Sequence, residues 1–127
     1  MREILFKAKH INTDKWVYGN YAFCDCYTKQ KHYIFQNKPL EYAVDENTIC
    51  QYTGLTDKYG NKIFENSIVK ISYDEDYSEI GYVKYSSAGV RYVLVIYGQT
   101  YRFDETCDIE VLGNRFDNPE LLGGMEC

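Results

Sequence analysis

The sequence feature that most constrains the fold is a set of three strand-like runs in the last third of the chain. Residues 80–85, 90–97 and 100–103 are rich in β-branched and aromatic side chains, and turn-forming residues separate them. The second separator, Gly98-Gln99, has glycine first, as a two-residue type II′ turn requires. The run at 90–97 is apolar on both faces, which predicts a central strand covered on each side. Together the runs predict an antiparallel meander.

The remainder of the chain shares this strand-forming character. Ile and Val number 18 and the aromatic residues 21, whereas Ala and Leu together number 11, so residues that suit a pleated surface outnumber good helix formers. Asn118 and Pro119 predict one helical turn near the C-terminus. We expect a mainly β protein of small antiparallel sheets or partly open barrels, made of hairpins and a meander, with at most one or two short helical turns. Further strand-like runs lie at residues 4–9, 16–23, 31–36, 68–73 and 109–114.

A length of 127 residues suits one domain or two very small ones. We expect a single domain over residues 1–127. A division into two β subdomains, with N-terminal strands at 1–47 and a C-terminal meander at 48–127, is the alternative that the sequence leaves open.

The balance of charge limits the class of protein. The formal net charge of −5 argues against a constitutive, sequence-independent nucleic-acid binder, because neutralising phosphates needs concentrated Lys and Arg. No window approaches the roughly 20 apolar residues that cross a bilayer, and the charged start at residues 1–7 does not resemble a secretion signal. We therefore expect a soluble, cytoplasmic protein with no membrane partner.

The five cysteines form an odd set without the spacing of a disulfide framework, and an intracellular protein would keep them reduced. We predict no disulfide. Cys24 and Cys26 share one face of a strand, and His32 lies on the expected neighbouring strand, which makes a metal site an alternative to two ordinary thiols. A lone Cys-x-Cys pair is a poor zinc signature, so we expect no metal and no cofactor.

Groups that catalyse reactions are not visibly assembled in this sequence. The two histidines, His10 and His32, lie near no Gly-x-Ser-x-Gly turn, and no Gly-x-Gly-x-x-Gly loop leads into a helix. The acidic runs at 74–79 and 104–110 lack the loop glycine and ligand spacing of a calcium site, which favours solvated charge over a bound cation. We expect no enzyme and no catalytic residue.

Aromatic residues and lysines alternate through the first forty residues, which points to a contact surface. The candidate contact residues are Lys7, Lys9, Trp16, Tyr18, Tyr21 and Tyr33. A tyrosine ring offers a large area with a polar tip and suits both half-buried strands and protein interfaces. In small β-barrels, aromatic platforms with flanking cations also bind single-stranded nucleic acid. A lysine-bearing sheet edge that blocks aggregation is the plainer interpretation.

Residues 51–69, with the sequence QYTGLTDKYGNKIFENSIV, strongly resemble the signature block of the YopX family of phage and prophage proteins. Residues 1–8 and 110–122 resemble the family's termini, so the resemblance spans essentially the whole chain. The signature residues are turn formers around buried apolar positions, which indicates a structural role. They are Gln51, Tyr52, Thr53, Gly54, Leu55, Asp57, Gly60 and Glu65.

The chain departs from the family pattern at two places. Glu65-Asn66-Ser67 stands where the family usually has Glu-Gly-Asp, and Lys7 and Lys9 stand where it has an Arg and a Trp. We expect Asn66 to replace the glycine in a left-handed turn, because Asn tolerates that backbone region.

The resemblance implies a small, β-rich, oligomeric phage protein whose family has no established biochemical activity. We therefore expect a non-enzymatic phage or prophage accessory protein that acts in the cytoplasm of the host bacterium as a homo-oligomer, by binding a host or phage protein or a small nucleotide. A single-stranded nucleic-acid-binding β-barrel is the alternative, followed by a metal-assisted hydrolase. The sequence does not identify the partner.

Overall fold

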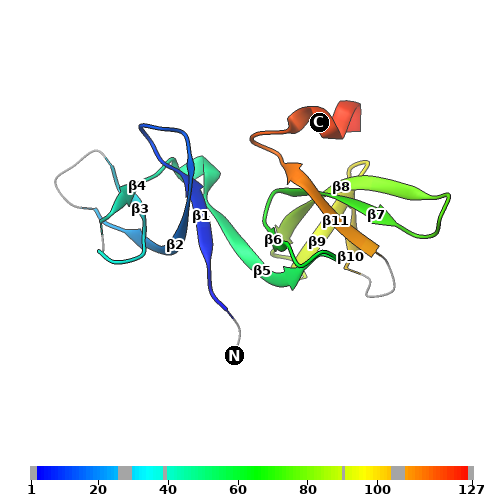
Figure 1. Ribbon diagram of the computed structural model, residues 1–127, viewed down its shortest axis with the longest axis horizontal. Helices are drawn as coiled ribbons and strands as arrows, with labels where there is room; N and C mark the ends of the chain where they lie inside the picture. The colour runs from blue at the N-terminus through cyan, green and yellow to red at the C-terminus, as the bar shows by residue number, and fades with distance from the viewer. Residues whose placement is uncertain (1–2, 26–29, 39, 90, 104–107, 126–127) are drawn as a thin grey trace. The chain divides into compact units, whose positions relative to one another are not determined.

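The computed structural model describes residues 3–25, 30–38, 40–89, 91–103 and 108–125 (Figure 1). Within these residues the regular structure consists of antiparallel strands and two short 3₁₀ helices, which confirms the expected mainly β fold. The strands form small open sheets rather than closed barrels. The chain divides into two compact units, an N-terminal unit (Met1–Tyr52) and a C-terminal unit (Thr53–Cys127).

The N-terminal unit is built on an antiparallel sheet with the strand order β4-β3-β2-β1-β5. Asp45 caps the 3₁₀ helix η1, because its side chain accepts a hydrogen bond from the N–H of Asn47. The elements of the unit are β1 (Phe6–Lys9), β2 (Trp16–Phe23), β3 (His32–Phe35), β4 (Tyr42–Ala43), η1 (Glu46–Thr48) and the first part of β5 (Cys50–Thr56).

One face of this sheet forms the core of the N-terminal unit. Alternate positions of a strand share a face, and the buried residues Ala8, Ile34 and Val44 pack together there. Gly19 in β2 is required by close packing, because a Cβ at this position would lie 2.4 Å from the carbonyl oxygen of Phe35. This close packing explains the glycine in the middle of β2.

The C-terminal unit contains a five-stranded antiparallel sheet with the order β10-β9-β8-β7-β11, and Figure 1 shows these strands side by side. The predicted meander is confirmed as β8, β9 and β10; β7 extends it as a further antiparallel strand, and β11 returns to pair with β7. The last part of β5 pairs with β6. The further elements are β6 (Lys62–Phe64), β7 (Ser67–Ser72), β8 (Ser78–Ser86), β9 (Arg91–Ile96), β10 (Gln99–Arg102), β11 (Asp108–Asn114) and the 3₁₀ helix η2 (Pro119–Met125).

The turn between β9 and β10 lies one residue earlier than predicted. Ile96 pairs with Gln99, so the turn residues are Tyr97 and Gly98. Both have positive φ, of 52° and 78°, as in a type I′ turn whose twist matches that of the flanking strands. The glycine identifies the hairpin, but the type II′ assignment to Gly98-Gln99 is wrong.

The core of the C-terminal unit lies on one face of the five-stranded sheet. On the other face of β9, Val93 and Val95 are also buried. The prediction of a central strand covered on both faces is therefore confirmed for β9, whereas Val90 lies outside the described residues. The core consists of alternate residues of β7, β8 and β9 with one residue of β6: Ile63, Val69, Ile71, Val83, Leu94 and Ile96.

The boundary between the two units falls within β5, between Tyr52 and Thr53. The sequence pattern places the alternative division between residues 47 and 48, five residues before this boundary. Residues 50–56 form one strand because the first part pairs with β1 and the last part with β6. In the part of the chain that the structure describes, no helix has the length and apolar character to cross a membrane.

Candidate functional site

The two predicted contact lysines lie against the single tryptophan of the chain. Lys7 is opposite Tyr18 and Lys9 is opposite Trp16 in the β1–β2 pair, so all four side chains share one face of the sheet. The Nζ atoms of Lys7 and Lys9 lie 4.4 Å and 5.5 Å from the centre of the Trp16 ring, which is the range of a cation–π interaction. Both lysine side chains are therefore engaged in contacts within the N-terminal unit.

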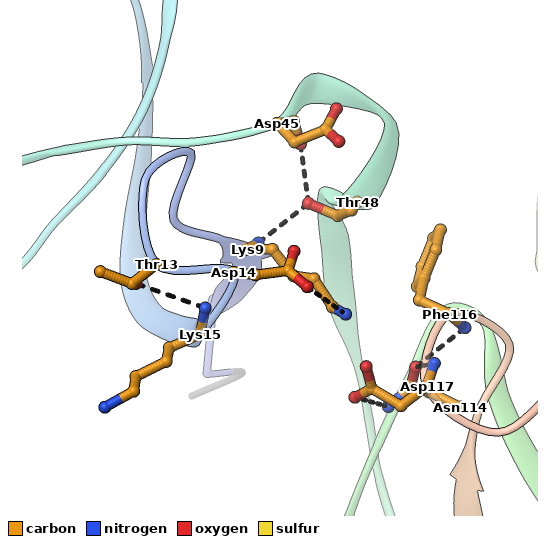
Figure 2. Close-up of polar contacts among 9 residues, drawn as sticks. All are labelled: Lys9, Thr13, Asp14, Lys15, Asp45, Thr48, Asn114, Phe116 and Asp117. Carbon is orange, nitrogen blue, oxygen red and sulfur yellow. Dashed lines mark hydrogen bonds and ion pairs between the residues drawn. The ribbon is translucent and has the colours of Figure 1, made fainter.

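Polar contacts hold Lys9 in place at the end of β1 (Figure 2). Its Nζ lies 3.6 Å from Oδ2 of Asp14. Its backbone N–H donates to Oγ1 of Thr48 at 2.9 Å, and the Thr48 hydroxyl donates to the carbonyl oxygen of Asp45 at 2.7 Å. Lys9 therefore joins β1 to η1 as well as carrying a charge.

The six predicted contact residues differ widely in exposure. Lys7 and Tyr33 are buried, and the Tyr33 hydroxyl donates to the carbonyl oxygen of Gln30 at 3.0 Å. The β2–β3 register places Tyr33 on the same face as Tyr18, and Tyr21 on the opposite, core face. Of the six residues, Tyr18 alone is largely exposed. The structure thus brings five of them to one face but leaves little of that set available to a partner.

Tyr21 begins a chain of three polar side chains. Its hydroxyl oxygen lies 2.6 Å from Nδ1 of His32, and Nε2 of His32 lies 3.0 Å from Oε2 of Glu46. The rings of Tyr21 and His32 stack, with centres 5.9 Å apart and an interplanar angle of 17°. Each ring nitrogen of His32 therefore has a polar partner, and the three side chains connect β2, β3 and η1.

A polar hollow of about 270 Å³ lies beside His32 and Glu46. Both ring nitrogens of His32 are engaged, and Nζ of Lys31 lies 3.0 Å from Oδ1 of Asp25. His32 and Lys31 at the border of the hollow are therefore engaged in contacts within the protein. The contact between His32 and Glu46 positions η1 against β3. The lining residues of the hollow are Ile11, Gln30, Lys31, His32, Val44, Asp45, Glu46 and Asn47.

The link between Tyr21, His32 and Glu46 is not visible in the sequence, where His32 stands out only as a candidate metal ligand. The available signal is the hairpin register, because placing Phe23 opposite His32 brings Tyr21 to the neighbouring position on the same face. The sequence carries no such signal for Glu46, because the position of Glu46 depends on the return of the polypeptide through β4.

Cys24 is disulfide-bonded, so the prediction of no disulfide is wrong. The missing framework spacing argued against a set of long-range bridges and did not bear on a single bond. Cys26 lies outside the described residues, and Cys50 is a buried thiol whose Sγ donates to the carbonyl oxygen of Thr48. A disulfide sulfur is not a thiolate ligand, which removes Cys24 from the proposed metal site. Among the described residues, no group of three or more His, Cys, Asp or Glu is placed to hold a metal.

Residues 74–77 of the first acidic run form an exposed loop between β7 and β8, whereas Glu79 lies within β8 and is half-buried. Oδ1 of Asp74 accepts the N–H groups of Asp76 and Tyr77 at 2.8 Å and 2.9 Å. This carboxylate therefore shapes the turn. Asp104 and Glu105 of the second acidic run lie outside the described residues.

The C-terminal unit has a second hollow, of about 160 Å³, beside its core. Tyr73 continues the alternation of β7, and Tyr101 is opposite Leu94, so both rings stand on the core face. Tyr73 and Tyr101 are each 46% exposed, and Tyr77, with its ring centre 5.3 Å from that of Tyr73, is 53% exposed. We call Tyr73, Tyr77 and Tyr101 the tyrosine rim. The hollow is lined by Ile71, Tyr73, Leu94, Ile96, Tyr101, Arg102 and Ile109.

The tyrosine rim is absent from the predicted contact residues. The alternation of Val69, Ile71 and Tyr73 does place Tyr73 on the core side of its strand. Nothing in that alternation shows that the neighbouring elements leave a hollow there, because the hollow depends on how β7, β9 and β11 pack.

Asp57 of the family signature holds the turn between β5 and β6. Its Oδ1 accepts the N–H groups of Tyr59 and Asn61 at 2.9 Å and 2.8 Å. Its Oδ2 accepts the N–H of Val111 at 2.9 Å, which ties the turn to β11. Burial opposes ionisation of Asp57, but the hydrogen bonds from Val111, Asn61 and Tyr59 outweigh it and lower the pKa of the carboxyl below its ordinary value. Gly60, with φ 85°, adopts the left-handed conformation of this turn.

The other signature residues also lie within β5 or its connections. The Thr53 hydroxyl donates to the carbonyl oxygen of Ile63 at 2.7 Å. The N–H of Tyr52, which is buried, donates to the carbonyl oxygen of Leu5 at 2.8 Å. These contacts favour the structural interpretation of the signature. The remaining members are Gln51 opposite Phe6, Gly54 with φ 92°, the exposed Leu55 and the half-buried Glu65.

Asn66 has a φ of 68°, so the expected left-handed conformation is confirmed. Its Oδ1 accepts a hydrogen bond from Nη1 of Arg115 at 3.3 Å. Arg115 also lies over the ring of Tyr82, with Cζ 3.9 Å from the ring centre. Ser67, in the place of the family's acidic residue, accepts the N–H of Phe64 through Oγ at 3.0 Å. Asn66 and Ser67 therefore both make structural contacts.

Comparison with known proteins agrees with these observations. The crystal structure of protein EF1440 from Enterococcus faecalis is similar, with a TM-score of 0.61 and 21% sequence identity, over 96% of this chain and 99% of that chain. At this identity the likeness concerns the fold alone. No curated protein matches. The family model described as YopX protein matches residues 5–123. Because that match spans nearly the whole chain, the protein belongs to the YopX family.

Proposed function

We propose that this chain is a non-enzymatic accessory protein of a phage or prophage, which binds a protein partner and acts as a homo-oligomer. The observation that carries the proposal is the tyrosine rim around the apolar hollow of the C-terminal unit. Membership of the YopX family supports the phage setting.

The tyrosine rim has the chemistry of a protein contact surface. A tyrosine buries a large area on binding while only two side-chain torsions lose freedom, and its hydroxyl can pair with a polar group at the edge of the contact. The lining of the hollow also includes the apolar residues Ile71, Leu94 and Ile96. Binding hot spots commonly combine aromatic residues with such a pocket.

The size of the hollow favours a protein partner over a small nucleotide. Pockets for drug-sized ligands have volumes of roughly 300–1,000 Å³, whereas this hollow has about 160 Å³. Among the described residues of its lining, Arg102 alone has a cationic side chain, and the β9–β10 register places that side chain on the face opposite Tyr101. Phosphate recognition commonly uses several charge-assisted hydrogen bonds. The hollow therefore suits one apolar side chain at the centre of a larger contact.

The single-stranded nucleic-acid alternative depends on the N-terminal lysines and rings. Lys7 and Lys9 lie over the Trp16 ring, and Lys9 is paired with Asp14, so this ring offers less free surface for a stacked base. Retardation of labelled single-stranded DNA that weakens steeply with salt would favour this alternative. No retardation at low salt would exclude it.

Partner capture tests the binding proposal. We would pass lysate of phage-carrying host cells over the tagged chain, its Tyr73→Ala/Tyr101→Ala variant and a Tyr59→Ala control. Tyr59 is 67% exposed in the same unit and does not line the hollow. We expect wild type and the control to recover the same partner, and the double variant to recover about tenfold less. Equal recovery by all three chains, each shown to be folded by circular dichroism, would contradict the proposal.

The oligomeric state needs a separate measurement. Gel filtration with light scattering should give a mass above that of one chain over a wide range of concentration. The mass of one chain at every concentration would defeat the homo-oligomer.

A further inference from the structure

We propose that strand β10 is the docking edge for an extended segment of the partner protein. The segment adds to the five-stranded sheet as a further antiparallel strand, with an apolar side chain in the hollow and an acidic side chain beside Arg102. This inference rests on the proposed function and states what kind of partner the tyrosine rim receives.

The backbone of β10 has groups directed away from the sheet. β10 is the edge strand and pairs with β9. Ile96 and Gln99 close the two-residue turn, so Gln99 and Tyr101 exchange backbone hydrogen bonds with β9. By alternation, the N–H and C=O groups of Thr100 and Arg102 point outward. Groups in this position are the ones that bind an added strand.

The opposite edge of the same sheet is covered. The N–H of Lys58 donates to the carbonyl oxygen of Ile109 at 3.1 Å, and the N–H of Val111 donates to Asp57. Within the described residues, no comparable hydrogen bond reaches the outer side of β10. All four residues of β10 are exposed, and the strand lacks the proline and lysine that commonly protect an edge. Among the described residues of the five-stranded sheet, β10 is therefore the edge left for pairing.

The side chains of β10 define the chemistry of the added segment. Tyr101 stands on the core face beside the hollow, so a residue opposite Tyr101 would point into the hollow and should be apolar. Arg102 stands on the other face, is exposed, and forms no ion pair with any described residue. A residue opposite Arg102 therefore lies beside a lone cation and should be acidic.

A synthetic peptide can test this geometry without the natural partner. We would titrate the full chain, labelled with ¹⁵N, with the peptide Ser-Glu-Leu-Thr-Val-Ser with blocked ends, which places Glu opposite Arg102 and Leu opposite Tyr101. We expect shifts in the amide signals of β9 and β10, and binding about fivefold tighter than for the peptide with Lys in place of Glu. Methylation of the peptide nitrogens should remove binding, because the added strand loses its donors.

Two pairs of variants separate the backbone contribution from the charge. Thr100→Pro removes an outward N–H and should weaken peptide binding about tenfold, whereas Thr100→Val keeps the donor and should bind like wild type. Arg102→Glu should reverse the preference and favour the lysine peptide. Lys84→Glu, at an exposed position of β8, carries the same charge change and should leave the preference unaltered.

The opposite outcomes are equally specific. An unchanged preference in Arg102→Glu, or equal binding by Thr100→Pro and Thr100→Val, would overturn the proposal. Loss of the oligomer in Thr100→Pro without peptide would also overturn it, because a second copy of this chain would then occupy the edge. If Tyr73→Ala/Tyr101→Ala loses partner capture and Thr100→Pro does not, the proposed function stands and the docking edge is rejected.

Discussion

The two units of this protein use aromatic residues in opposite ways. In the N-terminal unit the Tyr21 hydroxyl contacts an imidazole, the Tyr33 hydroxyl donates to a backbone carbonyl, and the Trp16 ring lies under two lysines. In the C-terminal unit Tyr73 and Tyr101 stand exposed beside an apolar hollow. One residue type therefore stabilises one sheet and forms the proposed contact surface of the other. Strand register and the cover over the core face decide which role it takes.

The cores of the two units differ in the same sense. Ile34, at the centre of the N-terminal core, is fully buried among other apolar side chains. Ile71 and Leu94 are buried as well but also line the hollow. The C-terminal core thus keeps an opening at the tyrosine rim.

Core truncation should show the largest difference between the units. Ile34→Ala should lower the free energy of unfolding of the N-terminal unit by about 4 kcal/mol, because it leaves a cavity in a closed core. Ile71→Ala should cost the C-terminal unit only about 2 kcal/mol, because its side chain already borders a hollow. Urea unfolding followed by Trp16 fluorescence and by circular dichroism measures both values. Equal costs would contradict the difference between the cores.

Asp57→Asn should show that the C-terminal unit depends on a buried carboxylate. The variant should lose about 2 kcal/mol at pH 7, because the N–H groups that Asp57 accepts lose a charged partner. The folded-state pKa of Asp57 lies below its ordinary value of 3.8, so its stabilisation is complete above that pH and is lost as the pH falls towards the folded-state pKa. Melting temperatures of both chains between pH 7 and pH 3 should therefore converge at the acidic end. A constant gap would show that ionisation of Asp57 is not involved.

Removal of single hydroxyl groups is the finest test of the comparison. Tyr21→Phe should lower the free energy of unfolding by about 1 kcal/mol, because His32 loses a hydrogen-bond partner in a partly buried site. Tyr101→Phe should change it by less than about 0.5 kcal/mol, because its hydroxyl is exposed. Thermal melting of the two variants beside wild type gives the difference. A larger loss of unfolding free energy in Tyr101→Phe than in Tyr21→Phe would show that the tyrosine rim stabilises the fold, which would contradict the comparison.

The meander was predictable because its signals are local. Alternation assigns Val69 and Ile71 to one face, and glycine-bearing separators mark the ends of the strands. Features that depend on pairing were harder to predict. Residues 53–56 have the composition of a turn, yet they extend β5 because β6 pairs with them. Likewise, no residue preference signals that Tyr97 adopts a positive φ.

The candidate site was less predictable than the fold, because its chemistry depends on contacts between distant segments. Lysine side chains are usually exposed, yet Lys7 is buried, with its Nζ over the Trp16 ring of the neighbouring strand. The contact of His32 with Glu46 requires the return of the chain through β4. Tyr73 was placed correctly on its strand face, but the hollow beside it also requires β9, β10 and β11.

Hydroxyl-radical footprinting of the chain, alone and with its captured partner, tests the central claim most directly. The claim is that the tyrosine rim of the C-terminal unit, rather than the aromatic residues of the N-terminal unit, contacts the partner. We predict that bound partner protects Tyr73, Tyr77 and Tyr101 from labelling while Tyr18 and Phe23 label as in the free chain. Protection of Tyr18 and Phe23 with unchanged labelling of the tyrosine rim would contradict the account.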